Sequence, residues 1–169
     1  MAIRIELLTK QKMSGVKFDC GEEALNNYIL RQAKQDMKRH VCATYILLDE
    51  SSLLGYYTLS STIIHFYQLT NIDDRMAKKL PKYPYLPATL LGRLAVKSET
   101  KGKRYGELLL IDALTRSYRN SAAIGSVVVV VDAKNKSASD FYKRYGFLDL
   151  KENQLFITMD TIKEVLDEV

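Results

Sequence analysis

Hydrophobic residues along the chain follow two periods, that of a strand and that of a helix, and the changes between them predict the elements of the first half. Ile3–Leu8 predicts a strand, and apolar residues at helical spacing predict a helix over Gly21–Arg39, whose basic end suits the helix dipole. Two β-rich runs follow, Val41–Leu48 and Leu53–Phe66. The polar residues between them, Asp49-Glu50-Ser51-Ser52, indicate a β-hairpin.

The second half begins with an irregular stretch, Tyr67–Pro87, which contains all three prolines and a short helix candidate near Asp73–Leu80. Loops of this length are usually functional or disordered. The remaining pattern predicts a strand at Thr89–Val96, a helix at Tyr105–Arg119, a strand at Ser126–Val131, a helix at Ser137–Tyr145, strands near Phe147–Leu150 and Leu155–Met159, and a last helical turn or two at Thr161–Glu168. The valine run before Asp132 is apolar enough for a strand that is buried on both faces.

These elements predict one mixed α/β domain over residues 1–169, because no repeat and no interior linker divides the chain. The length suffices for a buried core, and 47% of the residues are hydrophobic, yet no run is long enough to cross a bilayer. The N-terminal residues do not have the pattern of a secretory signal. Two cysteines and two histidines are too few for a disulfide framework or a cysteine metal site. We therefore expect a cytoplasmic protein with no membrane association and no metal.

Charge is distributed unevenly between the body of the chain and its C-terminal tail. The net charge is +5, but residues 149–169 contain six acidic residues against Lys151 and Lys163. Residues 1–148 therefore carry a net charge of +9 and the tail carries −4. A basic body favours polyanionic partners such as a nucleic acid or a nucleotide cofactor. Taken alone, the charge is also explained by a solvated surface that happens to be basic.

A first candidate site follows the predicted strand at Leu90–Val96. A basic loop with two glycines, Lys101-Gly-Lys-Arg-Tyr-Gly106, joins this strand to the next helix. Such a loop directs backbone N–H groups at the helix N-terminus, where the dipole also favours an anion. With its added lysines and arginine, the loop suits a pyrophosphate. An ordinary turn with a basic edge is the alternative, and the loop matches neither a P-loop nor a Rossmann glycine pattern.

A second candidate site lies one strand later. Asn135, Ala138 and Tyr142 are spaced so that they share one short helix, and Gly146 and Phe147 then close this helix into the next strand. For Tyr142 taken alone, the alternative is a half-buried helix tyrosine that packs on the sheet. The two candidate sites together carry more information than either of them alone.

Their combined pattern resembles the GNAT acetyltransferase superfamily. The matching residues are Leu94-x-Val96-x4-Lys101-Gly-x-x-x-Gly106, followed by Asn135-x2-Ala138-x3-Tyr142-x3-Gly146-Phe147, and the likeness extends over roughly residues 88–160. The resemblance implies a GNAT-like fold: a mixed, mostly antiparallel sheet flanked by helices, with a splay between the fourth and fifth strands. It also implies that acetyl-CoA, the co-substrate, lies in this splay.

The resemblance further implies a role for each matching residue. The backbone at Leu94, Ala95 and Val96 would pair with the pantetheine amides and the thioester, and Asn135 would help to hold the cofactor. Tyr142 would be the general acid that protonates the departing CoA thiolate. The pyrophosphate would lie in the loop formed by Lys101, Gly102, Lys103, Arg104, Tyr105 and Gly106.

The loop departs from the family pattern at two positions. Lys101 replaces the usual glutamine or arginine, and it should bind phosphate as a point charge without a planar fork. Arg104 replaces the usual second glycine. We expect a side chain there to be accepted only if the backbone keeps a negative φ and the side chain points outward.

Further blocks in the first half resemble one GNAT branch, the toxins of bacterial toxin–antitoxin pairs that acetylate the α-amine of aminoacyl-tRNA. These blocks are Phe18-Asp-Cys-Gly21 with Leu25-x2-Tyr28, then Gly55-Tyr-Tyr-Thr-Leu-Ser60, then Pro87-x3-Leu91-Gly-Arg-Leu-Ala-Val96. The branch implies aminoacyl-tRNA as the substrate and a small ribbon-helix-helix antitoxin as a partner. A homodimer is a further expectation, since GNAT proteins often dimerise.

The chemistry of the amine agrees with this substrate. An α-amine has a reference pKa of about 7.7–8.0, against about 10.4 for lysine, so a fair fraction is neutral at cellular pH and no strong base is required. No His or Glu stands beside the cofactor motif in an obvious pairing. A tyrosine acid with a reference pKa near 10 is well matched to protonating a thiolate.

Basic side chains offer contacts for tRNA phosphates. The candidates are Arg4, Lys34, Lys38, Arg39, Arg75, Lys78, Lys79, Lys82 and Arg93. Arg93 stands beside the cofactor strand and would be nearest to the acceptor end, although a structural ion pair explains it equally well. Two other functions stay open: a GNAT that acetylates a protein or small-molecule amine, and a non-catalytic acyl-CoA-binding module.

Overall fold

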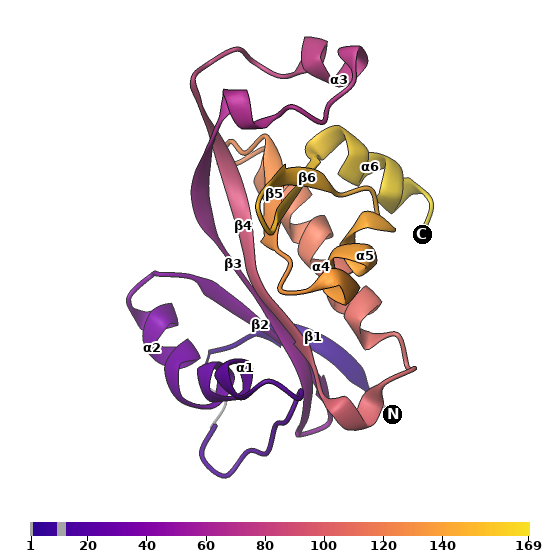
Figure 1. The fold of residues 1–169 in the computed structure, drawn as a ribbon. Coiled ribbons are helices and arrows are strands. Elements are labelled where there is room, and N and C mark those ends of the chain that lie inside the picture. Colours follow the sequence, from indigo (N-terminus) through magenta and orange to yellow (C-terminus); the bar gives the residue numbers. More distant parts are fainter. Residues whose placement is uncertain (1, 10–12) are drawn as a thin grey trace. The chain divides into compact units, whose positions relative to one another are not determined.

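The computed structural model describes residues 2–9 and 13–169, and over these residues seven strands alternate with helical segments (Figure 1). The strands are β1 (Ile3–Leu7), β2 (Ala43–Asp49), β3 (Ser52–His65), β4 (Tyr85–Val96), β5 (Val128–Asp132), β6 (Leu148–Lys151) and β7 (Gln154–Thr158). The α-helices are α1 (Glu23–Asn27), α2 (Ala33–Lys38), α3 (Asp74–Lys79), α4 (Tyr105–Asn120), α5 (Lys136–Lys143) and α6 (Met159–Asp167). A π-helical turn, η1 (Tyr28–Gln32), and two 3-10 turns, η2 (Phe66–Gln68) and η3 (Ser98–Thr100), complete the elements.

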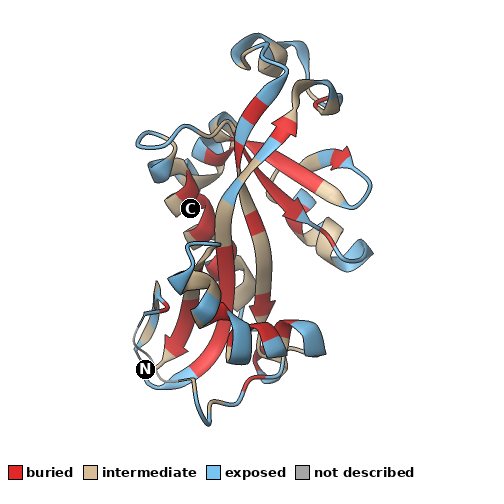
Figure 2. Ribbon diagram, turned by 90° about the vertical axis from the view of Figure 1, so that its left-hand side faces the viewer, coloured by how far each residue is buried: buried red, intermediate tan, exposed pale blue. Residues whose placement is uncertain are grey.

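The chain folds into two compact units, which are described separately. The first contains Met1–Ser60 and Gly92–Ala113, and the second contains Ser61–Leu91 and Leu114–Val169. The long strands β3 and β4 and the helix α4 each contribute residues to both units. Buried residues lie mainly along the strands and the inner helix faces, and exposed residues on the loops (Figure 2).

The first unit is an antiparallel sheet covered by the helical segment α1–η1–α2. β1 pairs with β2, and β2 pairs with β3 in a hairpin, with a bulge between Leu47 and Leu48. Its core contains Leu8, Phe18, Leu25, Tyr28, Ile29, Ala33, Ile46, Leu48, Leu53, Tyr56 and Ala95. The helix predicted over Gly21–Arg39 is therefore confirmed in its place and its buried face, but a π-helical turn interrupts it.

The second unit combines parallel and antiparallel pairing. β4 pairs in parallel with β5, from Ala88 opposite Val128 to Leu91 opposite Val131, and β5 and β6 are both antiparallel to β7. The four valines of β5 are at most 2% exposed, so the predicted burial of this strand on both faces is confirmed. The surrounding core contains Ile64, Leu69, Leu86, Ala88, Val128, Val130, Leu150 and Phe156.

The hydrogen-bonded strand order over the described residues is β1-β2-β3-β4-β5-β7-β6. This order, with one parallel pair in a mostly antiparallel sheet flanked by helices, confirms the predicted GNAT-like fold class. The parallel register ends at Leu91, whereas β4 continues to Val96, and the two strands therefore pair over only part of the length of β4.

One expected boundary is wrong. The strand predicted to begin at Thr89 begins at Tyr85, inside the stretch that was expected to be irregular because of its prolines. Burial alternates from the start of β4, since Leu86 and Ala88 are buried whereas Tyr85 and Pro87 are exposed. Pro87 has no N–H group, but its carbonyl oxygen accepts a hydrogen bond of 2.9 Å from the N–H of Val127. Pro87 therefore remains part of the strand pairing.

Candidate functional site

The last residues of β4 form the segment that was predicted to pair with pantetheine. Ala95 is 5% exposed and faces the core of the first unit, whereas Leu94 and Val96 are partly exposed. A glycine on the neighbouring strand β3 lets the backbone of this segment approach closely, because a Cβ atom at Gly55 would lie 2.7 Å from the carbonyl oxygen of Ala95. The segment of β4 that was predicted to hold the cofactor is thus packed tightly against β3 at Gly55.

Beyond β4, the loop Lys97–Gly106 is built from tight turns. The N–H groups of Thr100, Lys101 and Lys103 donate to carbonyls within the loop, at 3.0, 3.3 and 3.2 Å. The N–H groups of Gly102 and of the residues from Arg104 to Gly106 make no hydrogen bond within the described residues. The latter stand at the N-terminus of α4, a helix of 16 residues, and so form an anion-binding arrangement.

The side chains of this loop agree with the same chemistry. Lys101 and Lys103 are exposed, and Arg104 reaches Glu107 through an ion pair of 2.7 Å while remaining 78% exposed. Unpartnered N–H groups surrounded by cations suit a pyrophosphate. The donor set of the loop therefore fits the phosphate end of acetyl-CoA.

Arg104 corrects one expectation about this loop. Its φ is +61°, so the backbone has the left-handed conformation that the family's usual glycine would favour, and the expected negative φ is wrong. The side chain does point outward, as expected. The tight turn into α4 imposes the backbone conformation, and the exposed position leaves room for the side chain.

The second predicted motif lies on and around α5. Asn135 is the N-cap of this helix, and its side-chain oxygen accepts a hydrogen bond of 2.8 Å from the N–H of Ala138. It also lines a cavity of about 200 Å³ together with Lys136, Ser139 and Asn153. The structure thus gives Asn135 a local role in starting the helix, which the sequence analysis did not identify.

Tyr142 lies in the last turn of α5 and is 7% exposed. Its ring contacts those of Phe141 and Phe147, both at 5.3 Å between centroids. Burial, and secondarily the charge of Asp132, raises the pKa of the Tyr142 hydroxyl to about 12. The hydroxyl makes no hydrogen bond within the described residues, and it is not one of the fully buried side-chain oxygens. Packing therefore accounts for the ring but not for the hydroxyl.

Arg93 lies in β4 on the side of the sheet that the helical segment covers. Its guanidinium carbon is 3.5 Å from the centroid of the Tyr28 ring. The Tyr28 hydroxyl donates to a carboxylate oxygen of Asp36 at 2.8 Å and lies 3.0 Å from the sulfur of Cys42. Within the described residues Arg93 makes no ion pair at hydrogen-bond distance, so the structural ion pair considered above is not found. Sequence reasoning singled out Arg93 but missed Tyr28 as its support.

The other cationic candidates are divided between the two units. Lys34, Lys38 and Arg39 belong to the first unit, whereas the cations from Arg75 to Lys82 belong to the second. Arg4 is paired with Glu6, and Lys79 with Asp160, each at 3.1 Å.

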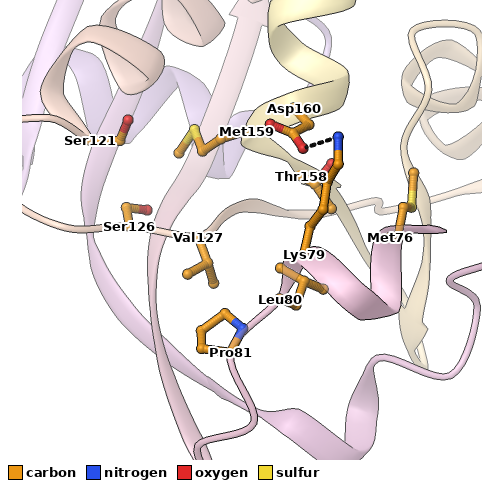
Figure 3. Close-up of a pocket in the computed structure, with 10 residues that line it drawn as sticks. All are labelled: Met76, Lys79, Leu80, Pro81, Ser121, Ser126, Val127, Thr158, Met159 and Asp160. Atoms are coloured by element: carbon orange, nitrogen blue, oxygen red, sulfur yellow. Dashed lines mark ion pairs between the residues drawn. The ribbon is translucent and has the colours of Figure 1, made fainter. Parts of the chain in front are cut away.

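A separate cavity of about 250 Å³ lies in the second unit between α3, α6 and the start of β5 (Figure 3). Apolar side chains, including Leu80, Val127 and Met159, form part of its lining, and Lys79 and Asp160, which also line it, form an ion pair. Of the residues predicted from the sequence to contact a ligand, Lys79, a candidate phosphate contact, is among those that line this cavity, whereas the predicted cofactor and catalytic residues are not. Among the described residues there is also no cluster of His, Cys, Asp and Glu that could hold a metal ion, and no helix long and apolar enough to span a bilayer.

Comparison with known proteins places these features in a family. Residues 87–161 match the family model described as an acetyltransferase (GNAT) domain. A probable toxin TacT from Sinorhizobium fredii is 24% identical over 96% of this chain and 94% of its own length. A tRNA-acetylating toxin from Mycobacterium tuberculosis is 27% identical over 77% of this chain and 75% of its own length.

Solved structures are similar over nearly the whole chain. A tyrosine-to-phenylalanine variant of KacT is 31% identical, with a TM-score of 0.83, and covers 98% of this chain and 99% of its own. AtaT in complex with acetyl-methionyl-tRNAfMet is also 31% identical, with a TM-score of 0.84 over 97% and 99% of the two chains. With this identity over nearly the whole of both chains and a matching family model, the chain belongs to the GNAT acetyltransferase superfamily.

Proposed function

We propose that this protein is an acetyl-CoA-dependent N-acetyltransferase that acetylates the α-amine of aminoacyl-tRNA, and that it acts in the cytoplasm as a toxin that blocks translation. The observation that carries the proposal is the likeness to AtaT in its complex with acetyl-methionyl-tRNAfMet, at 31% identity over almost the full length of both chains. A toxin named as tRNA-acetylating is similar over three quarters of its length.

The acetyl donor would be held by residues of three elements. The backbone of Leu94, Ala95 and Val96 would pair with the pantetheine arm, and the loop Lys101–Gly106 would bind the pyrophosphate. A similar structure of AtaT contains acetyl-CoA, which supports this donor. When bound, acetyl-CoA supplies a thioester as the activated acetyl group.

Asn135 would contribute to this site in two ways. Its side-chain oxygen is already used to cap α5, so its remaining amide group is what could reach the cofactor. Because the cap also orients the helix that carries Tyr142, the asparagine would influence the acid as well.

The reaction also needs a neutral amine to attack the thioester and a proton for the departing thiolate. The α-amine is partly neutral at cellular pH and can attack without a strong base. Tyr142 would give its proton to the departing thiolate. Its raised pKa of about 12 keeps the hydroxyl protonated at working pH, and its lack of a partner within the described residues leaves the proton available.

The protein would also have protein partners. Similar structures show AtaT bound to the C-terminus of its antitoxin AtaR, and KacTA bound to DNA. We propose that an antitoxin of the ribbon-helix-helix type neutralises this protein, and that two copies of the chain form a homodimer. In each copy, residues 1–169 would work as one N-acetyltransferase domain.

The first experiment follows the label from labelled acetyl-CoA into a pool of charged tRNAs, with wild type and Tyr142→Phe compared. We expect label on aminoacyl-tRNA with wild type and a rate about 10²–10⁴-fold lower with the variant, since that is the usual contribution of proton transfer. The matched control is Tyr118→Phe, which removes the hydroxyl of a partly exposed tyrosine on α4 and should keep full activity.

The outcomes separate the possible functions. If acetyl-CoA binds but no tRNA is labelled, the aminoacyl-tRNA proposal fails, and protein and small-molecule amines become the substrates to test. If wild type transfers no label to any amine and Tyr142→Phe changes no phenotype while cofactor binding persists, the protein is instead an acyl-CoA-binding module. Circular dichroism of both variants checks that the fold is intact.

A further inference from the structure

The guanidinium of Arg93 is held in place by stacking. Its central carbon lies 3.5 Å from the centroid of the Tyr28 ring, a close approach for a cation over an aromatic face. A guanidinium is planar and directs its N–H donors outward within its plane. Stacking of one face on a ring therefore fixes the plane of the group and leaves the donors at its edge available for a ligand.

Tyr28 is itself fixed by a chain of hydrogen bonds. Its hydroxyl has one proton, which it donates to Asp36 at 2.8 Å, so the Cys42 thiol at 3.0 Å is the donor to the Tyr28 oxygen. Gln32 donates to the other oxygen of Asp36 at 3.0 Å. These bonds span η1, the π-helical turn that begins at Tyr28, and such turns are often found at functional sites.

Asp36 remains a carboxylate in this network. Hydrogen bonds from Gln32 and Tyr28, with smaller contributions from the charges of Arg93 and Arg39, hold the pKa of Asp36 below its usual range. Asp36 thus supplies negative charge at the hydroxyl of Tyr28, and this charge attracts the guanidinium of Arg93. The support of Arg93 is therefore both geometric and electrostatic.

The donors of Arg93 have no partner of their own. Within the described residues, no hydrogen bond engages its N–H groups, and the side chain is partly exposed. A fixed, planar and unengaged guanidinium fits two oxygens of one anionic group, such as a phosphate or a carboxylate. In an aminoacyl-tRNA the α-carboxyl group of the amino acid is esterified, so phosphates are the anionic groups that every such substrate offers.

The position of Arg93 along the chain indicates where this phosphate comes from. Arg93 directly precedes Leu94–Val96, the segment proposed to hold the reacting end of acetyl-CoA. The pyrophosphate loop begins only at Lys101, on the other side of that segment. An anion at Arg93 would therefore belong to the acceptor rather than to the donor.

We propose that Arg93, stacked on Tyr28, binds a backbone phosphate in the single-stranded 3′ end of the acceptor RNA and so positions the amine for attack, with Tyr28 as a positioning residue. This inference rests on the proposed function. It adds the group of the substrate that is recognised and the pair of residues that recognises it.

The test measures binding of uncharged tRNA to the full-length protein by fluorescence anisotropy at several salt concentrations. We expect Arg93→Gln to weaken binding about 10- to 100-fold at low salt and to reduce the slope of log affinity against log salt by about 0.7, the contribution of one phosphate on a single strand. Lys163→Gln removes an exposed charge from α6 and should leave both quantities unchanged.

Three further variants separate recognition from a general loss of structure. Arg93→Lys should keep the salt slope but lose affinity, because an ammonium has no planar fork. Tyr28→Leu should raise the KM for aminoacyl-tRNA without lowering kcat, and Tyr28→Phe, which keeps the ring, should restore most of the loss. A merely structural role would change stability but not the salt slope.

Two results would overturn the proposal: a salt slope that Arg93→Gln leaves unchanged, or an equal loss of affinity for acetyl-CoA, which would assign the phosphate to the cofactor. These results are distinct from failure of the proposed function. A wild type that binds tRNA with an Arg93-dependent slope but transfers no label would refute the activity alone. Transfer that does not depend on Arg93 would refute this inference alone.

Discussion

Arg104 shows how a single residue can keep a backbone conformation that its side chain disfavours. Its φ of +61° lies in the left-handed region, which costs a residue with a Cβ atom about 1–2 kcal/mol. Arg104 directly precedes α4, so this strained residue lies where the loop turns into the helix. The arginine adds a cation to the proposed phosphate site, so charge is gained at the expense of backbone strain.

Substitutions at Arg104 should separate strain from charge. We expect Arg104→Gly to be more stable than Arg104→Ala by about 1 kcal/mol, because glycine adopts the left-handed conformation without a steric penalty and alanine does not. Urea unfolding of the two variants measures this difference. Both variants should bind acetyl-CoA more weakly than wild type, since both lack the cation. Equal stability of the two would show that the position is not strained.

Tyr142 should influence stability at alkaline pH. Its pKa is about 12 in the folded protein and about 10 when unfolded, so burial of the neutral hydroxyl stabilises the fold fully below pH 10. This contribution is lost as the pH rises from 10 toward 12, because the unfolded chain ionises first. By pH 11 wild type should lose about 1 kcal/mol more than Tyr142→Phe.

Unfolding by urea at pH 9 and at pH 11 measures this loss in both proteins. Tyr28 and Tyr56 also have raised pKa values because of burial, but they are present in both proteins and cancel in the comparison. An identical loss in wild type and variant would mean that the Tyr142 hydroxyl is not desolvated. Because its pKa is raised to about 12, we also expect that Tyr142 does not cause any fall in the acetylation rate between pH 8 and about pH 11.

At the scale of elements, the close approach of β3, β4 and α4 depends on Gly55. A Cβ atom there would lie 2.7 Å from the carbonyl oxygen of Ala95 and 2.9 Å from a methyl carbon of Leu109. Both distances are shorter than real contacts, so either the β4 segment or the helix would have to move. The glycine thus positions the strand that is proposed to hold pantetheine.

Gly55→Ala should therefore destabilise the protein by about 1–3 kcal/mol, the usual cost of overpacking a core. It should also raise the KM for acetyl-CoA, because the backbone at Ala95 and Val96 is displaced. Gly125→Ala is the matched control, since a Cβ atom there meets nothing within 4 Å. Thermal unfolding and kinetics compare the two variants. A Gly55→Ala protein with normal stability would contradict the tight packing described here.

The elements differ in how far the sequence pattern could predict them. The buried strand β5 and the buried face of the α1–η1–α2 segment follow from local patterns of apolar residues, which depend on the chain alone. The start of β4 could not be predicted in this way, because the prolines around it favour an irregular chain. Its pairing partners in other segments make it a strand. The π-helical turn at Tyr28 likewise has no signal in the periodicity.

At the scale of the whole molecule, the two compact units share three continuous elements. The strands β3 and β4 and the helix α4 each pass from one unit into the other. When one unit unfolds, an element that crosses the boundary loses part of its hydrogen bonds and packing. This loss also weakens the part of the element that belongs to the other unit. The connection therefore favours cooperative unfolding.

We accordingly expect a single unfolding transition in urea. The far-UV circular dichroism, which reports on helices and strands, should coincide with tyrosine fluorescence, which reports on tyrosines such as Tyr28 and Tyr142 in the two units. The protein contains no tryptophan, so tyrosine is the natural probe. Two separate transitions would show that the units are independent and would argue against one domain over residues 1–169.

The sequence by itself determined the family, the fold class and the order of the elements, because these depend on local periodicity and on motifs with defined spacing. It also located Lys101–Gly106, Asn135 and Tyr142 as candidate site residues. Only the tertiary structure decided the left-handed backbone at Arg104 and the stacking of Arg93 on Tyr28. The first depends on a turn imposed by its surroundings and the second on contacts between distant segments, and neither is encoded in the periodicity of a single segment.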